Sequence, residues 1–394
     1  MNTSITEEPG TETQALAEIS IEQKETEGLS QGQIVRRRFF RHRAAMISII
    51  VLAFIIVLAF TSVGVALWGI RIPGWWQYSW EEIPPKVNNG EPTMTLWPLQ
   101  FGDHPFGQDE VGRDIFAVVM RGTQQSIMVM VIAGVVATVI GVVIGAVAGY
   151  YGKWTDSVLM RFTDIIITIP LIVIGSVLGN ALGSLGAAVL GVVIGLFAWT
   201  TMARLVRGEF LSLREREFVD AARVSGARDR RIIFRHILPN AVGVIVVNAT
   251  LLMAGAILLE SALSFLGFGV LPPDTSLGKI ISENQAAFST RPWLFWWPGL
   301  FIIAIALCVN FIGDGLRDAF DPRQKKMPSE RAMARAGRAS GPLAPAVDTT
   351  PATDAPSVTV MGAAVYTSED IVSYHDIRPE HPGDPTDEPL NPER

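Results

Sequence analysis

Long runs of apolar residues constrain the fold of this chain more than any other feature of its sequence. A helix needs about 20 apolar residues, at about 1.5 Å rise per residue, to cross the hydrocarbon core of a bilayer. Residues 44–67 contain no charged side chain in 24 positions, and residues 126–150 form a second such run. The sequence therefore predicts a protein that crosses a membrane several times.

Six such spans can be placed along the chain. The apolar region 159–203 is too long for one span, and the stretch NALGSLG at 180–186 interrupts it, so we divide it in two. The predicted spans are residues 44–67, 126–150, 159–179, 185–206, 241–262 and 294–313. The expected fold class is an all-α membrane protein with six transmembrane helices.

The charge distribution separates the middle of the chain from its ends. The 394 residues carry a formal net charge of −6, and 49% of them are hydrophobic. Residues 1–35 carry −6 and residues 345–394 carry −8, so residues 36–344 carry +8. Because both ends have few apolar residues to bury, we expect the tails 1–35 and 321–394 to be disordered.

The basic residues of the middle predict its orientation in the membrane. Five arginines precede the first span at 36–43, and nine lie between the fourth and fifth spans at 204–235. The opposite loops, 68–121 and 263–293, contain only six Lys and Arg together. Loops rich in Lys and Arg stay in the cytoplasm. Both termini are therefore expected to be cytoplasmic.

The sequence has none of the usual arrangements of catalytic or metal-binding residues. Its five histidines are scattered without the spacing of metal ligands, and no GxxxxGK motif followed by Ser or Thr is present. The single G-x-S-x-G match, at 28–32, lies in the acidic tail with no preceding strand. We expect no enzyme activity, no metal site and no cofactor in this chain.

Charged residues are nearly absent from the middle of the predicted spans. Channels and ion-coupled transporters place ionisable residues there, so the energy source is not expected inside the bilayer. Glu260, near the outer end of the fifth span, and the uncharged Asn248 are the candidates for a place beside a pathway or an outer gate.

A strongly charged segment, EFVDAARVSGARDRRIIFRHILPN at 217–240, lies between two apolar runs. It contains five arginines, and one arginine at a helix centre costs about 2.5–3.5 kcal/mol on insertion scales. It therefore cannot be a span. The simplest interpretation is a solvated cytoplasmic loop that is rich in arginine, as the positive-inside rule expects.

The same segment has the pattern of two short helices. Phe218, Ala221, Ala222 and Ser225 recur at spacings of three and four and predict one face of small residues. Gly226 fits a left-handed position that ends the first helix.

Asp229 is expected to cap the second helix, in which Ile233 and Ile237 line one side. Pro239 fits the first turn of the next span. A small-residue face flanked by charge is what a helix needs in order to enter a partner's groove.

The segment resembles the EAA loop of the permease subunits of ABC importers. That pattern, E-A-A, three residues, Gly, nine residues, I-x-L-P, is matched at Asp220, Ala221, Ala222 and Gly226 and at the Leu238-Pro239 end. Asp220 replaces the glutamate, and His236 takes the isoleucine position. The resemblance implies an ATPase-coupling role for eight residues: Glu217, Asp220, Ala221, Ala222, Gly226, Ile237, Leu238 and Pro239.

Two further stretches resemble the oligopeptide/dipeptide branch of this family. They are HPFGQDEVGRDIFAVVMRGTQQSI at 104–127 and ILLESALSFLGFGVLPPDTSLGKII at 257–281. The resemblance covers about residues 36–320. An N-terminal span followed by a long outer loop is similar to the C-type subunit.

The resemblance implies a type I ABC importer permease fold and a set of partners. They are a homologous second permease, two ATP-binding subunits that carry the ATP site, and an extracytoplasmic solute-binding protein that delivers peptides. The chain would lie in the cytoplasmic membrane, form half of the pathway, and couple to the ATPase through residues 214–239. No nucleic acid is expected as a partner.

The same resemblance divides the chain into segments. These are a tail at 1–35, the first transmembrane helix with its basic flank at 36–68, an extracytoplasmic loop at 69–125, a five-helix permease core at 126–320 with a cytoplasmic coupling loop at 207–240, and a tail at 321–394. Two alternatives stay open. One is a permease for nickel or another small solute, and the other is a membrane receptor or scaffold that moves no solute.

Overall fold

The computed structural model describes residues 31–67, 70–96, 99–182 and 185–321, all within one compact unit. The predicted disorder of the two tails concerns residues that lie almost entirely outside these ranges and stays a prediction. Residues 31–35 are the exception, because they are helical. The first helices of the described chain are α2 (Gln31–Arg41) and α3 (Arg43–Ser62).

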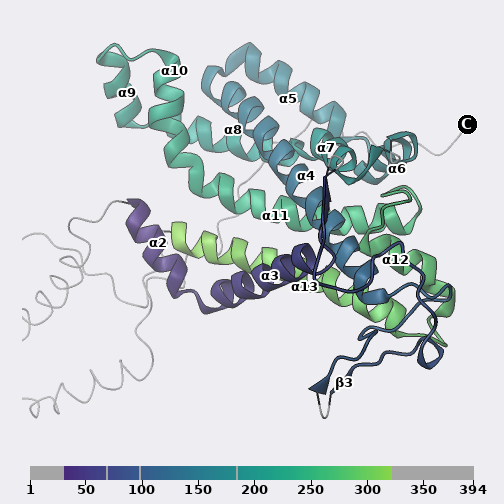
Figure 1. Ribbon diagram of the computed structural model, residues 1–394. Helices are drawn as coiled ribbons and strands as arrows, with labels where there is room; N and C mark the ends of the chain where they lie inside the picture. The colour runs from purple at the N-terminus through teal and green to yellow at the C-terminus, as the bar shows by residue number, and fades with distance from the viewer. Residues whose placement is uncertain (1–30, 68–69, 97–98, 183–184, 322–394) are drawn as a thin grey trace, which may run out of the picture. The chain divides into compact units, whose positions relative to one another are not determined.

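Helices dominate the described residues (Figure 1). After α3 they are α4 (Ile115–Tyr151), α5 (Lys153–Ile167), α6 (Leu171–Leu182), α7 (Ala187–Ala198), α8 (Thr200–Arg214), α9 (Glu217–Val224), α10 (Asp229–Arg231), the π-helical turn η3 (Ile232–Ile237), α11 (Leu238–Phe265), α12 (Leu277–Asn284) and α13 (Trp293–Phe320), with short 3₁₀ turns η1 (Asn88–Gly90) and η4 (Gln285–Ala287).

The loop between α3 and α4 contains strands that the sequence did not predict. β1 (Val65–Leu67) pairs with β2 (Ile70–Ile72), and β3 (Thr95–Leu96) pairs with β4 (Leu99–Gln100), both antiparallel. The predicted first span, 44–67, is therefore too long at its end. α3 stops at Ser62, and Gly64 has a φ of +71°, a left-handed conformation that suits glycine and redirects the chain into β1.

Four of the described helical stretches are long and apolar enough to cross a membrane: Arg43–Ser62, Ile115–Tyr151, Asp229–Phe265 and Trp293–Phe320. Two bent pairs, α5 with α6 and α7 with α8, pass the same test when each is taken as one span. The described chain thus has four to six candidate spans, and the predicted number is reached only if each bent pair crosses the membrane once.

The bends between the paired helices lie inside the predicted spans. α5 and α6 meet at 73°, and the break ends at Pro170, whose ring and missing N–H disfavour a continuous helix. α7 and α8 meet at 46° at the buried Trp199, where the sequence has no proline or glycine. Apolar periodicity alone could not distinguish these bent pairs from straight spans.

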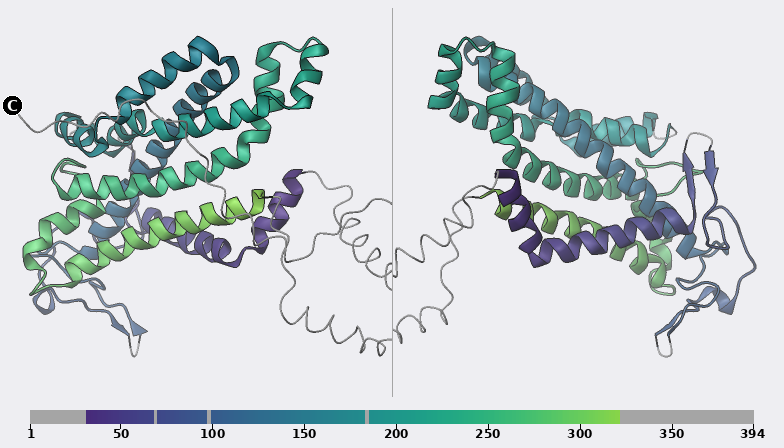
Figure 2. Two further views of the ribbon diagram at one scale, coloured as in Figure 1. Left: turned by 180° about the vertical axis from the view of Figure 1, so that it is seen from behind. Right: turned by 60° about the vertical axis from the view of Figure 1, so that its left-hand side comes forward.

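α4 is the central helix and packs against α7, α8 and α11 (Figures 1 and 2). Gly141, Gly145 and Gly149 form a stripe along its contact with α8. A β-carbon on Gly145 would lie 2.5 Å from the carbonyl oxygen of Ala203, closer than atoms pack. The small residues therefore set how closely the two helices approach.

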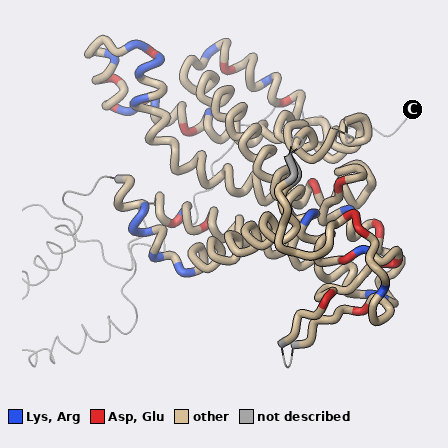
Figure 3. Tube along the Cα trace, viewed as in Figure 1, with Lys and Arg blue, Asp and Glu red and all other residues tan. Residues whose placement is uncertain are grey.

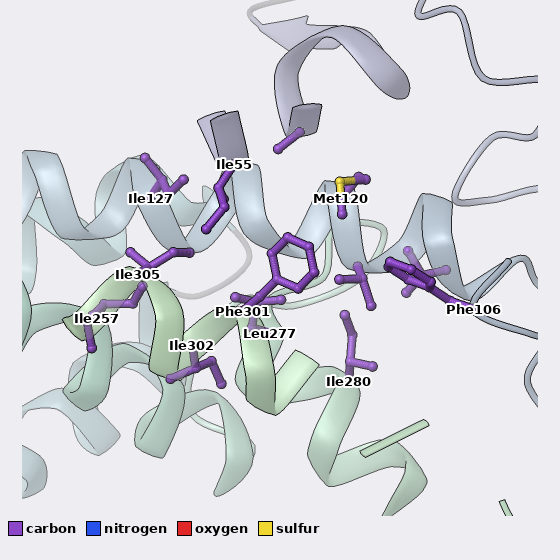
Figure 4. Packing of buried hydrophobic residues seen from close by; sticks show 14 of the residues in the cluster. Ile55, Phe106, Met120, Ile127, Ile257, Leu277, Ile280, Phe301, Ile302 and Ile305 are labelled. Atoms are coloured by element: carbon purple, nitrogen blue, oxygen red, sulfur yellow. The ribbon is translucent and has the colours of Figure 1, made fainter. Parts of the chain in front are cut away.

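Buried side chains from α3, α4, α11, α12 and α13 meet in one apolar cluster (Figure 4). Ile55, Ile127, Ile257 and Ile305 contribute to it, and Phe106 of the loop before α4 joins them. The Phe106 ring stacks on Trp297 of α13 with 3.9 Å between centroids. The cluster therefore fixes the loop that precedes α4 to the helices beneath it.

α4 begins at Ile115, well before residue 126, where the sequence predicted its span to start. Hydropathy missed its first turns because the polar side chains of Arg121, Gln124 and Gln125 lower the mean hydropathy there. All three side chains are buried. The side-chain amide of Gln124 donates to the carbonyl oxygens of Ala59 and Gly64, each at 2.7 Å. These polar side chains face protein instead of lipid and have hydrogen-bond partners, so the helix avoids the free-energy cost of exposing polar groups to lipid.

Candidate functional site

The charged segment 217–240 folds into a helical hairpin at one end of the molecule, formed by α9, a turn, α10 and η3 (Figure 1). We call these residues the coupling hairpin. Gly226 in its turn has a φ of +76°, the left-handed conformation that the sequence predicted. The Ala227 N–H donates to Ala222 O at 3.0 Å and the Gly226 N–H to Arg223 O at 2.9 Å, which closes the end of α9.

The inner face of the coupling hairpin is part of a buried cluster. Val219 and Ala222 of α9 are buried with Ile232 and Ile237 of η3, against Phe210 of α8. Ala222 therefore does not belong to an outward face shared with Ala221, as the spacing had suggested. It packs inward, because Val219 and Ala222 together form the apolar side of this short helix.

The outer face of α9 consists of Glu217, Phe218, Ala221 and Val224, all exposed. Val224 has 90% of its surface exposed, although it is apolar. Asp220 and Arg223 flank this face and form an exposed ion pair at 3.0 Å. Phe218, Ala221 and Val224 thus form a small exposed apolar face that is bordered by charge.

The second half of the coupling hairpin differs from the sequence prediction in two details. Ile232 and Ile237 are the fully buried pair instead of Ile233 and Ile237, because a π-helical turn brings residues five apart onto one face. Asp229 does not cap the helix. It is the first residue of α10, and its carboxylate accepts a hydrogen bond from the Tyr150 hydroxyl at 2.7 Å.

The end of the hairpin leads directly into α11. Leu238 begins α11 and Pro239 is its second residue, as the sequence predicted, but η3 runs directly into α11, so the missing N–H of Pro239 lies within a continuous helix. The stretch from Asp229 to Phe265 is therefore one helical unit of 37 residues with a π-helical turn near its start. Any displacement of α10 is passed to α11 without an intervening loop.

The hairpin is also fastened to α4. The Tyr150–Asp229 bond joins them, and next to it Arg214 of α8 donates to the carbonyl oxygen of Tyr150 at 3.0 Å, which joins α8 to α4. Tyr150 itself is buried at the end of α4. The sequence gave no signal for this contact, because 79 residues separate Tyr150 from Asp229.

Arginines surround the turn of the hairpin. Arg228, Arg230, Arg231 and Phe234 line an open cavity of about 400 Å³. Figure 3 shows Lys and Arg concentrated on α9, α10 and α2, whereas Asp and Glu are more frequent in the loop before α4. A partner that docks on the outer face of α9 would thus meet a positively charged border.

Glu260 lies elsewhere, on α11, and is fully buried. Its carboxylate accepts hydrogen bonds from Ser126 of α4 at 2.8 Å and from Ser264 at 2.7 Å. The N–H of Leu277, which begins α12, donates to the Ser126 hydroxyl at 3.4 Å. Glu260 thus joins three helices in the interior of this chain, and its place beside a pathway stays a prediction.

Asn248, the other pathway candidate, is half-buried on α11. Its side-chain amide donates to the carbonyl oxygen of Val244 in the same helix at 2.9 Å. This local bond satisfies the amide within the helix. Nothing in its contacts assigns it a pathway role.

A cavity of about 450 Å³ lies where both bent pairs approach α11. Its lining is mostly apolar and includes Pro170 at one bend, Thr200 beside the other, and Gly255 of α11. The sequence did not predict it, because its walls come from three separate helical regions. Broken helices that meet at one level are typical of substrate sites in membrane transporters.

The loop before α4 is held by a second polar network that the sequence analysis missed. Asp114 is the N-cap of α4 and accepts from Trp76 at 2.9 Å, and it lies 2.8 Å from His104. Burial raises the pKa of the Asp114 carboxyl, and the hydrogen bonds from His104, Ala117 N–H and Trp76 oppose that shift. The quoted stretch 104–127 contains both His104 and Asp114, so the motif itself was the signal.

Arg121, from the same motif, links α4 to the loop before α12. It forms a salt bridge to Asp274, with Nε 2.8 Å from the carboxylate, and its guanidinium lies 4.5 Å from the centre of the Trp80 ring. Among the described residues, no group of three or more His, Cys, Asp or Glu side chains could hold a metal ion.

Comparison with known proteins finds two family models on this chain. Residues 141–326 match the binding-protein-dependent transport system inner membrane component, and residues 30–82 match the N-terminal TM domain of oligopeptide transport permease C.

Curated relatives match most of the chain. The oligopeptide transport system permease protein OppC of Haemophilus influenzae is 39% identical over 305 residues, which covers 77% of this chain and 93% of that protein. The OppC proteins of Escherichia coli K12 and Mycobacterium tuberculosis H37Rv are 41% and 36% identical, over 95% and 98% of their lengths. Each alignment covers 77% of this chain.

Among solved structures, an inward-facing form of the MetNI methionine ABC transporter is similar at 20% identity. The match has a TM-score of 0.43 and covers 52% of this chain and 96% of the other.

Proposed function

This chain belongs to the oligopeptide transport permease C family, and we propose that it is the membrane-spanning subunit of an ATP-driven importer of peptides. It forms half of the translocation pathway, and a homologous second permease forms the other half. Two separate subunits bind and hydrolyse ATP, and an extracytoplasmic binding protein delivers the peptide. The names of the curated relatives support the peptide as substrate.

The observation that carries the proposal is the coupling hairpin. Its inner face is fixed to α4 and α8, while its outer face presents Phe218, Ala221 and Val224 to the outside. An ATP-binding subunit that receives this face in a groove can move α11 and α4 together, because the hairpin is continuous with one and hydrogen-bonded to the other. Of the eight residues named from the motif, Glu217 and Ala221 lie on the outer face, Asp220 flanks it and Gly226 forms the turn. Ala222 and Ile237 are buried in the hairpin, and Leu238 and Pro239 begin α11.

We assign the passage of the peptide to the face of the molecule that carries the apolar cavity between the two bends and α11. Bends at Pro170 and Trp199 give that face two sites where the wall can change shape. Each bent pair then counts as one span. The chain crosses the cytoplasmic membrane six times with both termini in the cytoplasm, which agrees with the arginines at 36–43 and 204–235.

The test is a bulky substitution on the outer face of α9. Ala221→Trp should abolish uptake of a radiolabelled tripeptide and co-purification of the ATP-binding subunits, because the ring would hold the two surfaces apart. Ala221→Ser keeps the small size and should leave both intact. Normal uptake by Ala221→Trp, at equal amounts of protein in the membrane, would overturn the docking assignment.

A backbone pair of variants tests the turn. Gly226→Val forces a β-branched residue into a φ of +76° and should impair uptake, whereas Gly226→Asn is tolerated there and should retain most of it.

The same uptake assay distinguishes the alternative functions. Uptake of radioactive nickel and not of peptide would show that the chain is a permease for nickel. A chain that co-purifies no ATP-binding subunit and supports no uptake would favour the receptor or scaffold alternative.

A further inference from the structure

The N-terminal helix α2 does not continue the axis of α3 (Figures 1 and 2). The interruption is at His42, which has an extended conformation with φ −81° and ψ 100°. Its Nδ1 accepts a hydrogen bond from the Ala45 N–H at 3.1 Å and so caps the start of α3. The bend between the two helices is therefore fixed by a specific residue.

One side of α2 is attached to the end of α13. Arg38 donates to the carbonyl oxygen of Asp321 at 3.1 Å, and the Nε2 of His42 lies 3.3 Å from the carboxylate of Asp318. Phe39 is half-buried next to Gly315. These contacts hold α2 against the helix bundle, so its opposite side has a defined direction.

The opposite side of α2 combines arginines with an exposed aromatic ring. Arg36 and Phe40 are four residues apart on α2, and Arg41 and Arg43 lie on either side of the bend at His42; all four are exposed. Phe40 has 60% of its surface exposed. Figure 3 shows this basic stretch as the positive segment at the start of the described chain.

The apolar surface of α3 begins directly after this group. Ile47, Ile50, Phe54 and Val57 recur at spacings of three and four, and all are exposed. In a membrane protein, an exposed apolar stripe of this kind faces acyl chains. The arginines of α2 and Arg43 therefore lie where that stripe ends, at the level of the lipid headgroups.

We propose that the junction of α2 and α3 is a binding site for anionic phospholipid, with the headgroup phosphate held by Arg36, Arg41 and Arg43. Guanidinium groups bind phosphate oxygens with two parallel hydrogen bonds. The exposed Phe40 ring lies at the boundary between headgroups and acyl chains, as in helices that lie flat on a membrane. Charge and position both match this occupant.

A soluble partner with an acidic surface fits this junction less well. It would neutralise the arginines, but it would leave the exposed Phe40 ring, next to the apolar stripe of α3, in contact with water. A lipid satisfies both parts of the site at once, since its headgroup is anionic and its chains are apolar. The proposal does not depend on the transported solute or on the ATP-binding subunits.

The experiment measures lipid retention by the full-length chain in mild detergent, with native mass spectrometry after addition of phosphatidylglycerol or phosphatidylcholine. The test variant carries Arg36→Gln, Arg41→Gln and Arg43→Gln. The control carries Arg228→Gln, Arg230→Gln and Arg231→Gln, which removes the same charge from three exposed arginines of the coupling hairpin.

We expect the affinity for phosphatidylglycerol to fall about fivefold per arginine removed from the junction, or about 100-fold for the triple variant. The control variant should bind as the unaltered chain does, and phosphatidylcholine should be retained weakly by all three proteins. Phe40→Ala, which changes no charge, should also weaken retention. Equal melting temperatures exclude misfolding as the cause.

Several results would overturn the proposal. If both triple variants lost the same affinity for phosphatidylglycerol, overall net charge and not the junction would explain the binding. If phosphatidylglycerol and phosphatidylcholine were retained equally, the site would not require an anionic headgroup. Normal retention by the junction variant would place lipid binding elsewhere. If that variant retained lipid but lost its ATP-binding subunits, the junction would be a protein-docking surface instead.

Discussion

A carboxylate inside the apolar part of a membrane protein has to be held by hydrogen bonds. Glu260 is held by serines from its own helix and from α4, and one of these serines also bonds the start of α12. The sequence could show an acid near the outer end of a span, but it could not show which side it faced. Its contacts indicate that it holds three helices together.

Two substitutions at Glu260 separate this structural role from a pathway role. Glu260→Ala should destabilise the protein by about 1–3 kcal/mol, because buried serine hydroxyls lose their acceptor. Glu260→Gln keeps the shape and one acceptor oxygen, so most of the stability and peptide uptake should remain. Thermal unfolding in detergent and uptake in cells measure the two effects. If Glu260→Gln lost uptake while its stability stayed unchanged, the result would support a role of Glu260 in the pathway.

Gly255 tests the assignment of the peptide passage. A β-carbon built on Gly255 meets no atom within 4 Å, and the residue lines the cavity between the bends. Gly255→Ala should therefore be neutral. Gly255→Trp should fill the cavity and stop peptide uptake while the ATP-binding subunits still co-purify. Full uptake with tryptophan at this position would show that peptides pass along another face.

Single residues were predictable where the local backbone decides their role. The φ of Gly226 and the position of Pro239 followed from the sequence, because a helix end and a first helical turn each favour one residue type. The inward direction of Ala222 and the Tyr150–Asp229 contact did not. Both depend on which elements pack together, and no spacing along the chain contains that information.

At the scale of helices, hydropathy located the apolar segments but not their ends or bends. α4 and α8 extend beyond the predicted spans because their outermost turns are polar, and in α4 those turns are buried in protein contacts. Pro170 was a visible signal for the bend between α5 and α6. The bend at Trp199 had no such residue. For the coupling hairpin, the turn at Gly226 and the two-helix outline were predicted correctly, whereas its buried face was not.

The contact between α4 and the coupling hairpin leads to a prediction about energy coupling. Tyr150→Phe keeps the buried ring but removes the hydroxyl that bonds Asp229. ATP hydrolysis by the assembled transporter should continue, while peptide uptake per ATP hydrolysed should fall about fivefold, which corresponds to one hydrogen bond of about 1 kcal/mol. Reconstituted vesicles allow both rates to be measured.

The neighbouring residue supplies the control for this variant. Tyr151 also lies at the end of α4, but its side chain is half-exposed. Tyr151→Phe should leave the ratio of uptake to ATP hydrolysis unchanged. An unchanged ratio in Tyr150→Phe as well would mean that α4 does not receive the motion of the hairpin through this bond.

For the whole molecule, the untested point is the orientation in the membrane. Cys308 is the single cysteine, so Cys308→Ser provides a background without thiols. Trp154→Cys at the start of α5, which lies outside the docking face and is 78% exposed, should react with a membrane-impermeant maleimide only after the cells are opened. Glu91→Cys in the exposed outer loop should react in intact cells. The reverse pattern would invert the proposed topology.

The length of α4 has a mechanical consequence. Its 37 residues form one unbroken helix of about 55 Å, with Asp114 bonded to the outer loop at one end and Tyr150 bonded to the coupling hairpin at the other. A stiff bar of this length that tilts by about 5° about its middle moves each end by about 2 Å, in opposite directions. α4 is then a lever, and the two ends of the protein cannot be displaced independently.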